Sequence, residues 1–265
     1  MSVIQTEGLS RSFGSLRAVA ELSIRVEAGE VFGLLGPNGA GKTTTIKMLA
    51  TLLPPTSGTA TVAGHDIRRE AMGVRRAIGY VPQLISADGT LTGFENLRVF
   101  ARLYDIPRRE CEGRVESALG LMGLSEHGHR LVREYSGGMI RRLEIAQSTL
   151  HHPQVLFLDE PTLGLDPGAR RLVWEHIDTL RRMFGTTILL TTHQMEEAET
   201  LCSRVAIMHH GIVVAIGTPV ELKAAVGRAG ASLDEVFIHF TGDKLESGGN
   251  YRETNRTRRV VRRLA

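Results

Sequence analysis

The chain has 265 residues, 42% of them hydrophobic, and carries a formal net charge of +3. This length supports one sizeable core, or one core with a subdomain, and no apolar run reaches the roughly 18 to 20 residues that span a bilayer. The two cysteines lie far apart, and no signal-peptide pattern opens the chain, so we expect a cytoplasmic protein with free thiols.

The positive charge gathers at the C-terminal end. Residues 251–265 hold six arginines and one glutamate, a balance of +5, which leaves −2 on the preceding 250 residues. A body of that sign is not typical of a nucleic-acid-binding surface, so no nucleic acid partner is expected. The basic tail, 241–265, is predicted to be disordered, and a role in binding anionic lipid or RNA is the alternative.

Residues 1–30 alternate apolar and polar side chains, which predicts two or three antiparallel strands. The apolar run 31–35 then predicts a buried strand, and 44–50 predicts a helix. Between them the chain matches every fixed position of the phosphate-binding pattern G-x-x-x-x-G-K-[ST]. The loop consists of Gly36, Pro37, Asn38, Gly39, Ala40, Gly41, Lys42, Thr43 and Thr44.

This loop has the residue types that a triphosphate needs. Its glycines let successive backbone N–H groups point at the β- and γ-phosphates, and the N-terminus of the following helix adds partial positive charge. Lys42 can neutralise the phosphates, and the Thr43 hydroxyl can occupy one position on Mg²⁺. A glycine-rich turn without a ligand is disfavoured, because strand, loop and helix follow one another in the required order.

Strands and helices alternate along the rest of the chain. Strands are predicted at 59–67, 78–81, 155–158, 187–190, 205–208 and 213–215, and helical segments at 91–123, 140–150 and 168–183. In the first helical segment, one face carries Leu97, Phe100, Ala101 and Leu103. This order predicts an α/β fold: a P-loop NTPase core with a mainly parallel sheet, an N-terminal antiparallel β subdomain and an all-helical subdomain inserted at about 84–150.

Two carboxylates end the apolar strand 155–158. A buried strand of this kind places Asp159 and Glu160 at the carboxyl edge of the sheet, beside the phosphate loop. Asp159 can hold Mg²⁺ directly or through water. Glu160 can accept a proton from the attacking water or orient it.

Ser136, Gly137 and Gly138 precede the predicted helix 140–150. A serine and two glycines at a helix start offer backbone N–H groups, a hydroxyl and the helix dipole to an anion. The same residues also suit a helix cap that binds nothing. From these residues alone the two interpretations stay open.

These motifs, in this order, resemble the nucleotide-binding ATPase of ABC transporters. The resemblance rests on the phosphate loop, Gln83, Ser136-Gly137-Gly138, Asp159-Glu160, Leu165-Asp166 and His193. It covers about 3–240, so we assign 1–240 to an ABC-type ATP-binding domain. In that family two subunits pack head to tail around two ATP molecules. The resemblance therefore implies a homodimer in which Ser136, Gly137 and Gly138 bind the γ-phosphate of the partner's ATP.

The resemblance also assigns roles to single residues. Gln83 matches the glutamine that senses Mg²⁺ and water, and His193 matches the histidine that contacts the γ-phosphate. Asp166 lies in the loop that communicates across the dimer. Phe13 stands where the family stacks an aromatic ring on adenine, although a core phenylalanine is equally consistent with the sequence.

Three further segments, 51–58, 135–139 and 232–237, look like the daunorubicin-resistance type of exporter ATPase. Such subunits work with a separate membrane permease at the cytoplasmic face of the membrane and use ATP and Mg²⁺. The resemblance implies a permease groove lined by 84–88, Leu97 and Phe100. The alternative is a soluble ABC-type ATPase acting on nucleic acid or ribosomes. That version is disfavoured, because Gln83 and Ser136 lie only 53 positions apart, without a heptad run, and the chain has one ATPase unit.

Overall fold

Six strands form the central sheet of the computed structural model, which describes residues 1–228 and 230–242. Their spatial order is β11 (Ile212–Gly217), β10 (Arg204–His209), β4 (Val31–Leu35), β9 (Thr187–Thr192), β8 (Val155–Asp159) and β7 (Ile78–Val81). Every neighbouring pair is parallel except β10 and β11. The strands β4, β8 and β9 are buried along their whole length, as expected for a parallel sheet covered on both faces.

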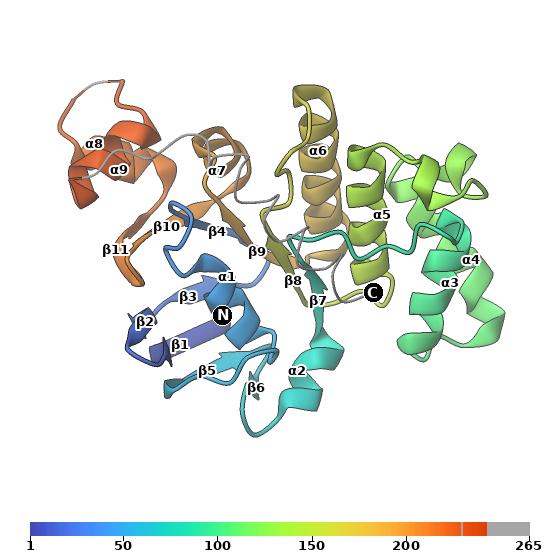
Figure 1. Cartoon of the computed structure of the whole chain (residues 1–265), viewed down its shortest axis with the longest axis horizontal. Coiled ribbons are helices and arrows are strands. Elements are labelled where there is room, and N and C mark those ends of the chain that lie inside the picture. Colours follow the sequence, from blue (N-terminus) through green and yellow to red (C-terminus); the bar gives the residue numbers. More distant parts are fainter. Residues whose placement is uncertain (229, 243–265) are drawn as a thin grey trace, which may run out of the picture.

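A second, antiparallel sheet comes from the N-terminal part of the chain (Figure 1). It consists of β1 (Ser2–Phe13), β2 (Leu16–Leu22), β3 (Arg25–Glu27), β5 (Ser57–Val62) and β6 (His65–Asp66). One core cluster joins Ile4 of β1, Phe32 of β4, and Ile46 and Leu49 of α1 (Lys42–Leu49). Helix α1 therefore lies between the two sheets, and its N-terminus is fixed by both.

Helices cover the opposite face of the central sheet. The helices α5 (Gly137–Thr149), α6 (Pro167–Phe184), α7 (Met195–Leu201) and α9 (Leu233–Thr241) contribute to the core cluster on this face. Alternate residues of the central strands supply the two clusters: Val31 and Leu35 pack on these helices, whereas Phe32 and Leu34 pack toward α1. Figure 1 places α8 (Pro219–Ala225) and α9 at one end of the molecule.

The segment between β7 and β8 contains α3 (Gly93–Leu103), α4 (Arg108–Leu121) and α5, with short 3₁₀ helices at Ser125–His127 and Val132–Glu134. Figure 1 shows α3, α4 and α5 grouped at the end of the molecule opposite α8. Thr92 caps α3 through a reciprocal capping box with Glu95, which explains why the helix begins there. The fold class predicted from the sequence is confirmed; the bounds of a separate helical subdomain stay a prediction.

Some predicted details were wrong. Helix α1 begins at Lys42 rather than at 44, because Gly41, with φ of 102°, turns the loop directly into the helix. Leu103 is 70% exposed instead of packing with Leu97 and Ala101, because it is the last residue of α3. The seven-residue helix α2 (Ala71–Ala77) was not predicted, since it has no side-chain cap and buries only Val74.

The described part of the chain ends at Gly242, directly after α9, so the predicted basic tail lies outside it from residue 243 onward. Within 1–228 and 230–242, no helix combines the length and hydropathy needed to cross a membrane. Cys111 and Cys202 are free thiols, as expected.

Candidate active site

The predicted site residues follow four adjacent strands. The phosphate loop follows β4, and His193 follows β9. Asp159 is the last residue of β8 and Glu160 comes directly after it, and Gln83 comes two residues after β7. Because these strands are parallel neighbours, their carboxyl ends meet at one edge of the sheet. The fold therefore brings together chemistry that is scattered over more than 150 positions of the sequence.

The phosphate loop is a tight backbone cradle with Asn38 and Gly39 exposed at its tip. A Cβ atom at Gly36 would lie 2.2 Å from the carbonyl oxygen of Met208, and one at Gly41 would lie 2.4 Å from that of Ala18. Any side chain at either position would displace the neighbouring backbone. These two glycines are thus required by the close approach of the neighbouring backbone, which fixes the curl of the loop.

Lys42 is buried at the start of α1, and its ammonium group contacts three oxygen atoms. The Nζ atom donates to the carbonyl oxygens of Gly36 at 2.7 Å and Pro37 at 3.1 Å, and lies 3.2 Å from Oε1 of Glu160. The other carboxylate oxygen of Glu160, Oε2, lies 2.9 Å from Nδ1 of His193. Glu160 is therefore held between the phosphate loop and His193.

Asp159 is almost fully buried, and its oxygen Oδ1 accepts two hydroxyl hydrogen bonds. Thr43 donates at 2.9 Å and Thr191 at 2.7 Å. Among the described residues, no cluster of three or more His, Cys, Asp or Glu side chains could hold a metal ion. Magnesium needs no such cluster, since it binds through one or two carboxylates, phosphate oxygens and water. The hard oxygen atoms of Thr43 and Asp159 fit this ion.

Glu160 has an uncommon backbone conformation for a residue with a side chain. Its φ is 50°, in the left-handed region, which costs of the order of 1–3 kcal/mol and is found where the surroundings enforce it. Its N–H group points at Thr191, with the carbonyl oxygen at 3.2 Å and the hydroxyl oxygen at 3.0 Å. Thr191 thus positions both carboxylate residues.

Sequence reasoning missed Thr191 as a site residue. It lies near the end of the buried strand β9, directly after the apolar run 188–190, and is completely buried. A polar side chain at the carboxyl end of a buried strand is the same signal that identified Asp159. The following residue, Thr192, accepts a hydrogen bond from the N–H of Gly36 at 3.2 Å and so ties β9 to the phosphate loop.

Two predicted site residues, Gln83 and Phe13, are exposed and lie apart from the hydrogen-bonded residues around Asp159 and Glu160. Gln83 lies exposed beyond β7. Phe13 is 46% exposed at the end of β1, with the guanidinium of Arg11 4.6 Å from its ring centroid. The alternative that Phe13 is a core residue is therefore wrong, and the guanidinium of Arg11 covers one face of its ring.

The Ser-Gly-Gly segment begins α5. Ser136 is exposed and caps the helix by accepting from the N–H of Met139 at 3.3 Å. Gly137 is exposed beside it. A Cβ atom at Gly138 would lie 2.7 Å from Cβ of Ala169, so this glycine allows α5 to approach α6 closely.

Asp166 caps the neighbouring helix α6 and accepts from the N–H of Ala169 at 2.9 Å. A capping role is thus present for both Ser136 and Asp166. The contacts within the chain do not test their ligand-binding and dimer roles, which stay predictions.

A buried carboxyl group links the loop after Glu160 to the helices. Oε1 of Glu197 in α7 accepts from the hydroxyl of Thr162 at 2.7 Å and from Nε1 of Trp174 at 2.9 Å. Burial raises the pKa of Glu197 above its ordinary value, and the nearby charge of Glu160 acts in the same direction. Glu197 therefore fixes this loop against α6 and α7.

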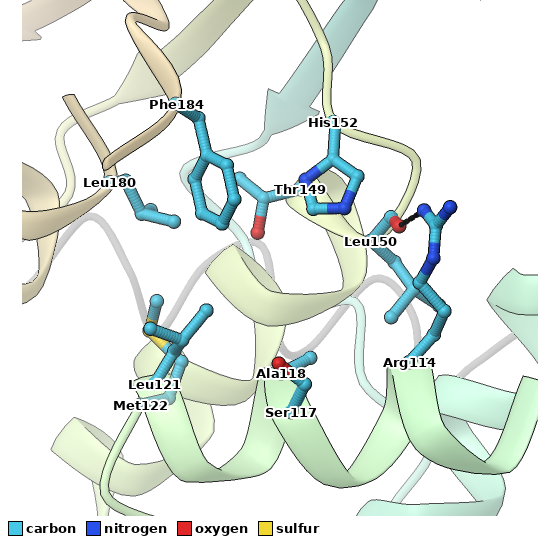
Figure 2. A pocket seen from close by; sticks show the side chains of 10 residues that line it. All are labelled: Arg114, Ser117, Ala118, Leu121, Met122, Thr149, Leu150, His152, Leu180 and Phe184. Atoms are coloured by element: carbon cyan, nitrogen blue, oxygen red, sulfur yellow. Dashed lines mark hydrogen bonds between the residues drawn. The ribbon is translucent and has the colours of Figure 1, made fainter. Parts of the chain in front are cut away.

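Figure 2 shows a small cavity elsewhere in the molecule, between α4, the end of α5 and the end of α6. Its volume is about 40 Å³, and its lining includes Leu121, Leu180 and Phe184. Pockets for small-molecule ligands usually measure about 300–1,000 Å³. Leu180 and Phe184 belong to the end of α6 opposite Asp166, so this cavity is not the nucleotide site.

A parallel sheet whose strand ends carry a phosphate loop, two carboxylates and a histidine defines a P-loop ATPase. The chain belongs to the ABC transporter family, whose model matches residues 19–163. It is thus an ATP-binding, ATP-hydrolysing subunit of a transporter.

Several curated proteins resemble the chain over most of its length. The daunorubicin/doxorubicin resistance ATP-binding protein DrrA of Streptomyces peucetius is 48% identical over 224 residues, which cover 84% of this chain and 68% of that protein. The Nod factor export ATP-binding protein I of Paraburkholderia xenovorans (strain LB400) is 43% identical, with 89% and 77% covered. The linearmycin resistance ATP-binding protein LnrL of Bacillus subtilis (strain 168) is 40% identical, with 85% and 72% covered.

Two solved structures share the fold. The ATP-binding subunit of an ABC transporter superposes with a TM-score of 0.80 and 31% identity, covering 91% of this chain and 100% of the other. The second is cbiO1 from Clostridium perfringens, described as part of the ABC transporter complex cbiONQ. It gives a TM-score of 0.78 and 28% identity, covering 84% of this chain and 91% of the other.

Proposed function

We propose that this chain powers the export of a drug-like or lipophilic compound through its permease. The observation that carries the ATPase part is the Glu160 carboxylate, held between Lys42 of the phosphate loop and His193. The names of the relatives, which concern drug resistance and export, support the transport part. They favour it over a soluble ATPase acting on nucleic acid or ribosomes. The test is whether ATP-driven export is lost when Glu160 becomes Gln.

The contacts within the site support the roles proposed for most of its residues. Glu160 orients and deprotonates the attacking water, and His193, bonded to the same carboxylate, contacts the γ-phosphate. Lys42 offsets the charge of the phosphates. Thr43 and Asp159 would hold Mg²⁺, and Gln83, exposed two residues after β7, would sense it. When bound, Mg²⁺ offsets charge that develops on the phosphate oxygens.

The hydrolysing unit in this proposal is a head-to-tail homodimer. Ser136 and Gly137 are exposed at the N-terminus of the 13-residue helix α5, where a hydroxyl, backbone N–H groups and the helix dipole can reach an anion outside the chain. They bind the γ-phosphate of the partner's ATP. Asp166, exposed at the start of α6, lies in the loop that faces the partner.

The permease binds at the loop after β7 and holds the subunit at the cytoplasmic face of the membrane. Leu84 and Ile85 are 81% and 66% exposed, so this loop presents apolar side chains to solvent. Leu97 is completely buried and cannot line the groove that the sequence predicted; Phe100 is only partly buried. The surface for the permease therefore centres on the loop rather than on the Leu97 face of α3.

We expect the Leu84→Asp and Ile85→Asp variants to fold and to bind ATP as the wild type does, but no longer to bind the permease. A carboxylate placed in an apolar contact must be desolvated without a partner, which weakens binding. Co-purification with the co-expressed permease and export from cells are the measurements.

Val220→Asp is the matched control for this experiment. Val220 is also an exposed apolar residue, at 77%, but it lies in α8 at the far end of the molecule (Figure 1). The Val220→Asp variant should still co-purify with the permease. Loop variants that still co-purify and export would place the membrane contact elsewhere.

A further inference from the structure

One buried arginine side chain binds the backbone at the end of β8, where Asp159 and Glu160 lie. The guanidinium of Arg141, in α5, is buried and uses all five of its N–H donors. Nε donates to the carbonyl oxygen of Pro161 at 2.8 Å, and Nη2 donates to those of Asp159 at 2.8 Å and Glu160 at 3.1 Å. The backbone carbonyl groups of three consecutive residues are therefore bound to one planar guanidinium. Two of these residues, Asp159 and Glu160, carry the site carboxylates.

The remaining donors of Arg141 lead toward β7. Its Nη1 atom donates to the carbonyl oxygen of Pro82 at 2.6 Å and to Oε2 of Glu144 at 3.2 Å. Glu144 lies one turn further along α5 and is 2% exposed. Its other oxygen, Oε1, accepts from the N–H of Ser86 and, at 3.0 Å, from the Ser86 hydroxyl. The loop 82–86 is thus tied to Arg141 at both ends.

Between these two ties lie Gln83, Leu84 and Ile85, which are all exposed. Hydrogen bonds connect this exposed segment to the interior, from Ser86 to Glu144 and from Glu144 to Arg141. A displacement of the segment can therefore be passed along these bonds. The route ends at the carbonyl group of Glu160, whose backbone is in the left-handed region. A rigid, buried and fully bonded guanidinium transmits displacement, because each of its bonds fixes direction as well as distance.

We propose that Arg141 and Glu144 are positioning residues that couple the loop 82–86 to the placement of the Glu160 carboxylate. The proposal rests on the function proposed above, in which Glu160 acts on water and the loop contacts the permease. Arg141 and Glu144 themselves touch no substrate. They set the catalytic rate by holding the peptide groups on either side of the reacting carboxylate.

The first experiment compares lysine variants at two adjacent arginines of α5. Arg141→Lys replaces a planar fork by an ammonium group that cannot reach five acceptors. We expect kcat to fall about 10- to 100-fold, because a small misplacement of a reacting group costs rate steeply. ATP affinity should stay at the wild-type value, since the phosphate loop is untouched. Turnover is expressed per site that binds a fluorescent ATP analogue, so loss of folded protein does not count as loss of rate.

Arg142→Lys is the matched control. Arg142 is half-buried and also donates to backbone carbonyls, to Met122 at 2.7 Å and to Gly138 at 3.4 Å, but these belong to the helical segment and not to β8. We expect unchanged kcat per site in this variant. An equal fall in both variants, or no fall in Arg141→Lys, would overturn the proposal.

A second pair of variants tests the outer end of the route. Ser86→Ala removes the hydroxyl contact with Glu144, and Ser86→Thr keeps a hydroxyl there. We expect Ser86→Ala to lower kcat and Ser86→Thr to keep it at the wild-type value. Ser86→Ala should lower kcat no further in the Arg141→Lys background, since both changes weaken the same chain of bonds. Effects that multiply in the double variant would contradict the coupling.

Glu160→Gln separates this inference from the function on which it rests. If Glu160→Gln keeps wild-type turnover, the role assigned to Glu160 is wrong. If Glu160→Gln stops turnover while Arg141→Lys keeps the wild-type kcat per site, only the inference about Arg141 and Glu144 fails.

Discussion

Glu160→Gln should bind ATP as the wild type does and lose about 10²- to 10⁴-fold in kcat, the usual contribution of a general base. The amide keeps an oxygen that can accept from Lys42, but it cannot take a proton from water. Lys42 also keeps its bonds to the carbonyl oxygens of Gly36 and Pro37, so the phosphate loop should hold its shape. The variant should therefore separate binding from hydrolysis.

ATP binding is measured by equilibrium titration, and hydrolysis by phosphate release at saturating ATP and Mg²⁺. Glu196→Gln is the control, because Glu196 is an exposed carboxylate in α7 that pairs with Arg170. It should keep the wild-type kcat. If Glu160→Gln hydrolyses ATP within a few-fold of the wild-type rate, another group performs the base chemistry.

Ser136→Arg is expected to abolish hydrolysis while the isolated chain keeps its affinity for ATP. Ser136 is exposed at the start of α5, so the long cationic side chain can be accommodated without unfolding the chain. In the proposed dimer it blocks the γ-phosphate position of the partner's nucleotide. Lys42 and Thr43, the proposed nucleotide ligands within the same chain, are unaffected.

The complementing variant is Lys42→Ala, which loses the ammonium group at the phosphate loop. Neither variant alone forms an intact site. Mixed heterodimers contain one, made of the wild-type phosphate loop of the Ser136→Arg chain and the wild-type Ser136 of the other. We expect the mixture, and neither variant alone, to form an ATP-bound dimer in analytical ultracentrifugation. A mixture that behaves like its separate components would exclude the head-to-tail arrangement.

The site residues that belong to a short sequence motif could be predicted from the sequence. The loop 36–44 has a fixed spacing, and Asp159 and Glu160 follow an apolar strand, so both were found without the fold. That Lys42 and Glu160 lie 3.2 Å apart could be stated only after the strand order placed β9 between β4 and β8. Local pattern identifies the groups, and sheet topology brings them together.

Arg141 shows what local pattern does not reveal. An arginine in a helix is usually exposed, and nothing in the surrounding residues indicates that this one is buried against the end of β8. Its burial depends on the carbonyl groups of Pro82, just after β7, and of Glu160, just after β8, which lie 59 and 19 positions away in the sequence. Leu97 and Leu103 make the same point, since equal apolar character gave one core residue and one exposed residue at the helix end.

The most direct test of the account is a structure of Glu160→Gln determined with ATP and Mg²⁺. The account predicts a twofold dimer in which each ATP lies between the phosphate loop of one chain and Ser136 to Gly138 of the other, with Mg²⁺ on Thr43 and Asp159. A nucleotide bound away from Lys42, or a metal ion that contacts neither Thr43 nor Asp159 directly or through water, would contradict it.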